Sequence, residues 1–168
     1  MSQYQKGLVS SMRYGLISDI HGNLEALEAA LEELAKERID EYLCIGDIVG
    51  YGANPKECIK IVRKLEPKAL IAGNHEWGVL GFLGIDYFNE YAQEAILWTK
   101  NVLSDHETDY LKSFKLFWSE DGMTLVHGSL EEPQEFYYIF DTDDADKTLK
   151  LQKTQVCFVG HSHVPGIF

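Results

Sequence analysis

Basic residues are scarce in this sequence. Its 168 residues include 15 lysines and arginines against 27 aspartates and glutamates, a formal net charge of −12. Such a chain repels phosphate-rich polymers and anionic membrane surfaces, so we expect no general nucleic-acid binding and no membrane partner, although a small positive site stays compatible with this charge. No apolar run reaches the about 18 residues of a membrane-spanning helix. With 45% hydrophobic residues, the chain is long enough for one domain with a sizeable core.

Cysteine is scarce as well. Cys44, Cys58 and Cys157 are odd in number, widely spaced and set in apolar surroundings, which favours reduced core thiols over a disulfide framework. A reducing cytoplasm is therefore the expected location. Residues 1–11 lack the apolar core of a signal peptide. We interpret them as a leader, an expression-derived extension or an early start, and place the domain at 12–168.

Short apolar runs alternate with helical patterns along the rest of the chain. Five runs predict buried strands, at 13–18, 42–45, 69–72, 123–126 and 156–159. Helices are predicted at 24–34, from Pro55 onwards, at 90–103, at 107–114, and after the acidic run 141–146 to near Lys153. The stretch 77–87 has no clear period, and we interpret it and the helices after it as a cap or lid. This alternation predicts an α/β fold with a mainly parallel sheet.

Each predicted strand is followed within two residues by Asp, Asn or His. Because ligands of such sheets bind beyond the carboxyl ends of the strands, the fold would bring these side chains into one crevice. A single histidine or aspartate after a strand is more often a hydrogen-bonded loop residue or a helix cap. Five such ends together favour a metal or catalytic site. Five of the six histidines lie there: His21, His75, His127, His161 and His163.

The residue types narrow the choice of metal. Imidazole nitrogens combined with carboxylate and amide oxygens, without thiolates, suit a divalent transition ion rather than calcium or a structural zinc. Seven candidate ligands are too many for one ion, so two ions follow if one carboxylate bridges them. The candidates are Asp19, His21, Asp47, Asn74, His127, His161 and His163.

Five short blocks contain these residues. They read Asp19-Ile20-His21, Gly46-Asp47-Ile48-Val49-Gly50, Gly73-Asn74-His75-Glu76, His127-Gly128-Ser129 and Gly160-His161-Ser162-His163. In this order they resemble the calcineurin-like metallophosphoesterases, in particular their small prokaryotic phosphodiesterase and phosphatase branch. The resemblance implies a β-sheet sandwich flanked by helices. Members usually continue past the last block, so a chain that stops at Phe168 is expected to be a fragment without the C-terminal strands.

The resemblance also implies a role for each ligand. Asp19, His21 and His163 would hold one metal, Asn74, His127 and His161 would hold the other, and Asp47 would bridge them. Manganese is the expected metal, with iron, zinc or nickel as alternatives. His75 would be the general acid. Asn74 and His75 would contact the substrate, and Tyr51, Tyr137 and Tyr138 are further candidates to line the pocket.

The implied reaction is hydrolysis of phosphodiesters or phosphomonoesters by a hydroxide that bridges the metals, with His75 protonating the leaving group. The substrate would be a phosphate-ester small molecule or a nucleotide. A homo-oligomer is compatible with the sequence. Gly50, Tyr51 and Ala72 stand where protein phosphatases carry two phosphate-clamping arginines and the carboxylate that would pair with His75, which disfavours that activity. The alternative is a non-catalytic scaffold or binding protein of the same fold, although such proteins have lost ligands that this chain retains.

Two acidic features have simpler interpretations. Glu76 is expected to orient neighbouring groups or to cap a turn rather than to bind metal. The run 141–146 lacks the glycine and terminal glutamate of a calcium loop, so a solvated helix start is the better interpretation.

Overall fold

A computed structural model describes residues 12–168, and the predicted leader at 1–11 lies outside the described residues. The helices are α1 (Leu24–Lys36), α2 (Pro55–Leu65), α3 (Asn74–Leu80), α4 (Glu90–Val102), α5 (Asp105–Lys112) and α6 (Thr142–Leu151). The strands are β1 (Tyr14–Ile17), β2 (Glu41–Cys44), β3 (Ala69–Leu70), β4 (Phe117–Glu120), β5 (Met123–Val126) and β6 (Val156–Phe158). The predicted α/β class is confirmed.

The strands form two three-stranded sheets. In the first, β1, β2 and β3 are parallel and lie in that order. In the second, β5 pairs antiparallel with β4 and parallel with β6. A parallel bridge between Ile71 and Lys115 joins the end of β3 to the segment before β4. Within residues 12–168 the pairing is thus mainly parallel, as predicted, and the strands form the two sheets that the family resemblance implied. The strand β4, with its antiparallel pairing, was not predicted.

The helices begin where the sequence supplies groups to cap them. The Asn23 side chain accepts from the backbone N–H of Ala26 at the start of α1, and Pro55 opens α2, where its missing N–H leaves no donor unpaired. Asp141 accepts from the backbone N–H groups of residues 143 and 144. The acidic run thus begins α6, as expected of a solvated helix start, although the helix contains the run instead of following it.

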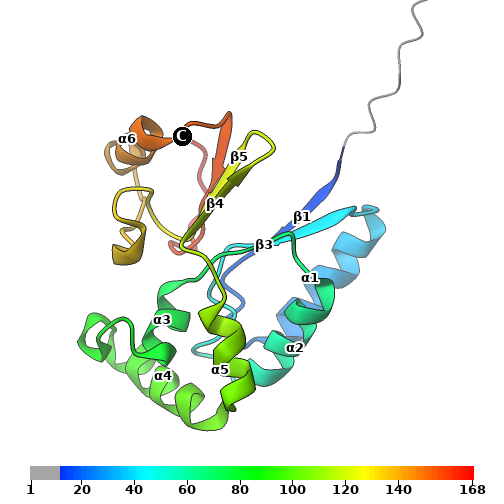
Figure 1. Cartoon of the computed structure of the whole chain (residues 1–168), viewed down its shortest axis with the longest axis vertical. Coiled ribbons are helices and arrows are strands. Elements are labelled where there is room, and N and C mark those ends of the chain that lie inside the picture. The colour runs from blue at the N-terminus through cyan, green and yellow to red at the C-terminus, as the bar shows by residue number, and fades with distance from the viewer. Residues whose placement is uncertain (1–11) are drawn as a thin grey trace, which may run out of the picture.

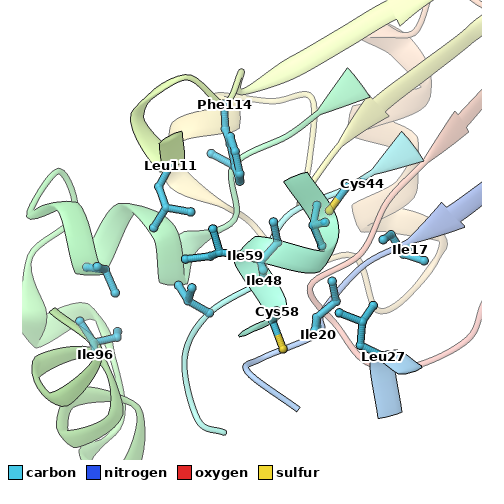
Figure 2. Packing of buried hydrophobic residues seen from close by; sticks show 14 of the residues in the cluster. Ile17, Ile20, Leu27, Cys44, Ile48, Cys58, Ile59, Ile96, Leu111 and Phe114 are labelled. Carbon is cyan, nitrogen blue, oxygen red and sulfur yellow. The ribbon is translucent and has the colours of Figure 1, made fainter. Parts of the chain in front are cut away.

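Two hydrophobic clusters hold the layers together. The larger one packs α1, α2, α4 and α5 against the first sheet, and Figure 2 shows Cys58 and Ile59 of α2 between Leu27 on one side and Leu111 on the other. The smaller cluster joins Leu43 and its neighbours in the first sheet to Leu125 of β5. The two sheets therefore share a core and form a sandwich. Figure 1 shows α1 and α2 beside the first sheet and α6 beside the second.

The cysteines are free thiols, as predicted, but only two of the three belong to the core. All three cysteines lie within the described residues, and each is unpaired, with Cys44 and Cys58 buried. Burial raises the pKa of the Cys44 thiol to about 12, which keeps it protonated and unreactive. Across residues 12–168, every helix is too short or too polar to span a bilayer.

Candidate metal centre

The segments that follow five of the strands converge on one pocket. Their ligand-type atoms form three overlapping groups, and within each group the atoms lie within 4.8 Å of one another. The groups are Asp19, His21 and His163, then His21, Asp47 and His75, and finally Asp47, His127 and His161. Asn74 lines the same pocket. The structure thus brings all seven predicted ligand residues together, although they are spread along the chain from Asp19 to His163.

One side of the site is formed by Asp19, His21 and His163. His163 Nε2 lies 3.2 Å from Asp19 Oδ1 and 3.0 Å from His21 Nε2. The Asp19 carboxylate also accepts the backbone N–H of His161 at 3.0 Å. This contact fixes the loop after β6 against the loop after β1, which is why residues 142 positions apart meet here.

Asp47 stands between this side and the other. Its Oδ1 accepts the backbone N–H of His75 at 2.9 Å. Its Oδ2 lies 3.7 Å from His21 Nε2 and 3.1 Å from His127 Nε2. Asp47 is only 1% exposed, so one buried carboxylate faces histidines of both groups. This is the position that a bridging ligand requires.

Backbone carbonyls set the tautomers of two histidines. His21 Nδ1 lies 3.2 Å from the carbonyl oxygen of Val49, and His127 Nδ1 lies 2.6 Å from that of Ile45. Because a carbonyl oxygen only accepts, each Nδ1 carries a hydrogen, and Nε2 is left as the nitrogen that would face a metal ion. This arrangement is the usual orientation of a metal-binding histidine.

Several polar atoms of the site have no protein partner. Asn74 Oδ1 and His161 Nε2 are buried without a hydrogen bond, and His127 Nε2 faces Asp47 without hydrogen-bond geometry. Buried polar atoms are rarely left unpaired. The lone pairs of His21 Nε2 and His163 Nε2, 3.0 Å apart, repel each other unless a cation or a proton lies between them. These residues therefore fit divalent metal ions, with the mixed nitrogen and oxygen donors that transition metals prefer.

Burial and charge shift the pKa values of the site in different directions. Burial lowers the pKa of His75 and of His161 to about 4, so both rings are neutral at pH 7. Burial acts in the same direction on His127, but its pairing with the Asp47 carboxylate prevails and raises its pKa to about 9. Burial opposes ionisation of Asp47, yet the surrounding histidines hold its pKa below the usual range. Asp47 is thus the ionised carboxylate of the buried half of the site.

The Glu76 carboxylate holds the loop that carries Asp47. Its Oε2 accepts the backbone N–H groups of Asp47 and Gly73, each at 2.8 Å, and its Oε1 accepts those of Ile48 at 2.8 Å and Val49 at 3.2 Å. Glu76 is fully buried and belongs to none of the three candidate ligand groups. The structure gives it the orienting contacts that were expected of it.

Five of the seven candidate ligands have a left-handed backbone. Their φ values are +52° at Asp19, +50° at His21, +52° at Asp47, +68° at His161 and +54° at His163. Asp and His are several-fold enriched in this region among residues other than glycine, and each such residue costs on the order of 1–3 kcal/mol unless its surroundings hold it in place. The backbone hydrogen bonds that the Asp19 and Glu76 carboxylates accept are two such restraints.

Three of the four remaining predicted residues line the pocket beside the candidate ligands. His75 and Tyr51 line the pocket, and their rings lie 4.7 Å apart. His75 Nδ1 is buried without a partner, and a Cβ at Gly50 would lie 2.1 Å from it, so only glycine leaves room for this ring. Tyr137 does not line the pocket, because its hydroxyl turns away and donates to Glu132. Its neighbour Tyr138 lines the pocket and stacks on His161, 3.8 Å between ring centroids.

Comparison with known proteins agrees with this geometry. A sequence model of the calcineurin-like phosphoesterases matches residues 12–165. The chain belongs to this family. The predicted resemblance and the sandwich fold that it implied are confirmed.

Individual relatives support the same assignment. An uncharacterized protein of Methanocaldococcus jannaschii is 42% identical over 164 residues, which cover 95% of this chain and 65% of that protein. The crystal structure of a metallophosphoesterase from Sphaerobacter thermophilus is 41% identical, with a TM-score of 0.81 over 92% of this chain and 62% of that one. A hypothetical protein from Pyrococcus horikoshii OT3 shares the fold, at 22% identity and a TM-score of 0.74 over 89% and 69% of the two chains. The calcineurin-like phosphoesterase chain described here thus spans somewhat less than two thirds of the first two relatives.

Proposed function

We propose that this protein is a two-metal phosphoesterase that hydrolyses phosphodiesters or phosphomonoesters. The observation that carries the proposal is the position of Asp47. One buried carboxylate belongs to two groups of potential ligands, and the Nε2 atoms of His21 and His127 face it from opposite groups. A site built for one ion would not need a shared carboxylate at its centre.

The family resemblance and the grouping of these side chains support two ligand sets. Asp19, His21 and His163 would hold one ion together with Asp47, while Asn74, His127 and His161 would hold the other with the same carboxylate. Two such cations would supply Lewis acidity at the phosphoryl group and a water of lowered pKa beside it. Manganese suits these nitrogen and oxygen donors, and iron, zinc or nickel would also fit.

The protein's own side chains would position the substrate and move a proton. The buried Asn74 amide would orient the phosphoryl oxygens without adding charge to the site. His75 would donate a proton to the leaving oxygen. Its ring is neutral before substrate arrives, but a phosphate anion beside it would favour the protonated form through opposite charge.

The charge of the site supports a phosphate-ester substrate. Two divalent cations against the carboxylates of Asp19 and Asp47 leave a formal charge of about +2. The sequence as a whole carries −12, so this positive charge is confined to the pocket. An acidic protein can therefore attract a small phosphate ester while repelling long polyanions.

Metal analysis tests the proposal. The purified chain, saturated with manganese and freed of unbound metal, should carry about two ions per molecule and hydrolyse bis-p-nitrophenyl or p-nitrophenyl phosphate. Asp47→Asn should reduce the bound metal to below about one ion and abolish turnover, because it removes charge from the ligand shared by both ions. The matched control is Asp86→Asn, which changes an exposed aspartate.

Two results would contradict the proposal. Fewer than about one bound ion in the wild-type chain would exclude the two-metal site. Full metal loading without release of p-nitrophenolate from either ester would favour the non-catalytic scaffold of the same fold.

A further inference from the structure

Aromatic rings dominate the pocket in front of the candidate metal centre. The pocket has a volume of about 620 Å³ and is open to solvent. Tyr51, Tyr87, Tyr138 and Phe140 contribute to its lining, and Tyr51 also lines a neighbouring groove with Trp98 of α4. Among the described residues that line this pocket there is no lysine and no arginine.

Three of the rings form a stack that begins at a candidate ligand. The ring of Tyr138 lies 3.8 Å from that of His161 with 17° between their planes. The ring of Phe140 continues the stack at 5.0 Å and 9°. Phe140 is 59% exposed, so part of the outermost ring remains open. The stack therefore presents a planar apolar surface next to the site where the phosphate would lie.

The absence of cationic side chains from the lining limits the charge that the pocket can accept. A phosphodiester carries one negative charge, whereas a monoester or an additional phosphate adds further charge. Additional phosphates are usually bound by arginine or lysine, which provide donors and positive charge together. The proposed metal ions and a protonated His75 would supply the positive charge here, and all of them would be engaged by the reacting phosphate and its leaving group. The pocket is thus suited to a single phosphodiester group.

We propose that the pocket selects phosphodiesters that carry a planar aromatic group, such as a nucleoside or an aryl ring. The group that stays on the phosphate would stack against Phe140, whose ring is supported by Tyr138. This inference rests on the proposed phosphoesterase function and adds the class of substrate to it. Aromatic side chains bind bases by stacking without strict sequence preference.

Esters with the same leaving group test whether the planar group that stays on the phosphate stacks against Phe140. Thymidine 5′-(p-nitrophenyl phosphate), bis-p-nitrophenyl phosphate and methyl p-nitrophenyl phosphate all release p-nitrophenolate. The measured quantity is the ratio of kcat/KM for each aromatic ester to kcat/KM for the methyl ester. Phe140→Leu should lower both ratios at least about fivefold, from the usual size of base stacking. Phe117→Leu is the matched control, since Phe117 is 53% exposed on β4 and outside the pocket.

A second pair of esters tests the limit on charge. Thymidine 3′-phosphate 5′-(p-nitrophenyl phosphate) differs from the first ester only by an additional phosphate. Its kcat/KM should be at least about fivefold lower, because no cationic side chain receives that phosphate. An equal or higher value would overturn the preference for a single phosphodiester group.

A binding measurement separates failure of this inference from failure of the proposed function. Thymidine 5′-methyl phosphate, titrated into the manganese-loaded protein, should bind at least about fivefold more weakly to Phe140→Leu than to wild type or Phe117→Leu. Unchanged ratios and unchanged binding in Phe140→Leu would overturn the stacking surface, while continued hydrolysis of the methyl ester would leave the proposed function standing. Loss of binding in Phe140→Leu without turnover of any ester would support the stacking surface and contradict the proposed hydrolysis.

Discussion

Glu76→Gln tests how the loop that carries Asp47 is held. The substitution keeps the size and shape of the side chain, but an amide has one accepting oxygen where the carboxylate has two. The wild-type carboxylate accepts four backbone N–H groups, two on each oxygen. In either orientation of the glutamine, two of these buried N–H groups lose their acceptor and face the donating NH₂ group.

The size of the effect follows from the number of lost acceptors. A buried donor without a partner costs about 1–3 kcal/mol, so two such donors should lower the free energy of unfolding by about 2–6 kcal/mol. Burial and the nearby Asp47 carboxylate raise the pKa of Glu76 to about 7. The measurement should therefore be made near pH 8.5, at which the wild-type side chain is ionised. Since the raised pKa means that a charged Glu76 costs folding free energy at this pH and the amide avoids that cost, the net loss should lie toward the lower end of this range.

Urea unfolding measures this difference directly. The midpoint for Glu76→Gln should fall by about 1–3 M if the slope is about 2 kcal/mol/M. Hydrogen exchange should become faster for one of two pairs of amides, either Ile48 and Val49 or Asp47 and Gly73, depending on which oxygen position the glutamine NH₂ group takes. The control is Glu32→Gln on the exposed face of α1, which should change stability by less than about 0.5 kcal/mol. A loss below about 1 kcal/mol with an unchanged slope would refute this account of Glu76.

Two further predictions concern the proton donor and a surface ion pair. His75→Ala should lower kcat for a diester with a poor alkyl leaving group by about 10²–10⁴-fold, while the metal content stays unchanged. The loss of kcat for a p-nitrophenyl ester should be much smaller, because this leaving group needs no proton. Equal losses on both esters would exclude an acid role. Lys68 hydrogen bonds to Asp121 at 2.7 Å and lowers the pKa of its carboxyl group. Because the folded-state pKa is depressed, the stabilisation is present at neutral pH and is lost as the pH falls through that value. Thermal unfolding of Asp121→Asn should show a lower Tm than wild type near pH 7 and no difference in strong acid, and a difference independent of pH would contradict this.

The regular parts of the fold were predictable because their signals are local. Apolar runs marked five of the six strands, although β6, predicted to be buried, is largely exposed. A spacing of three or four residues marked the helices that pack on the first sheet. The missed strand β4 lacks both signals, since three of its four residues are exposed and its stability comes from pairing with β5. Asp121-Gly122 joins these strands with positive φ at both residues. An Asp-Gly pair is a strong hairpin signal, so this pair was the available indication of β4.

Helix α3 was not predicted from the sequence, for a different reason. Its seven residues include a glycine and a tryptophan and have no helical period that a sequence could display. The helix begins at Asn74 because Glu76 accepts the Gly73 N–H while also holding the loop after β2. Its start is thus set by a contact between distant segments, and only the folded chain brings those segments together.

The candidate site was also predictable only in part. Residue type and position at strand ends identified the candidate ligands, because the carboxyl ends of strands meet in this class of fold. How the ligands are held depends on the backbone, and the left-handed residues after β1, β2 and β6 have no sequence signature beyond the choice of Asp and His. Tyr137 and Tyr138 are equivalent in the sequence, yet only Tyr138 lines the pocket. Adjacent side chains of one loop point in different directions, so choosing between them requires the loop's conformation. The chemistry of the site is therefore encoded in residue types, whereas its selectivity depends on loop geometry, which the Phe140 and Glu76 variants would test separately.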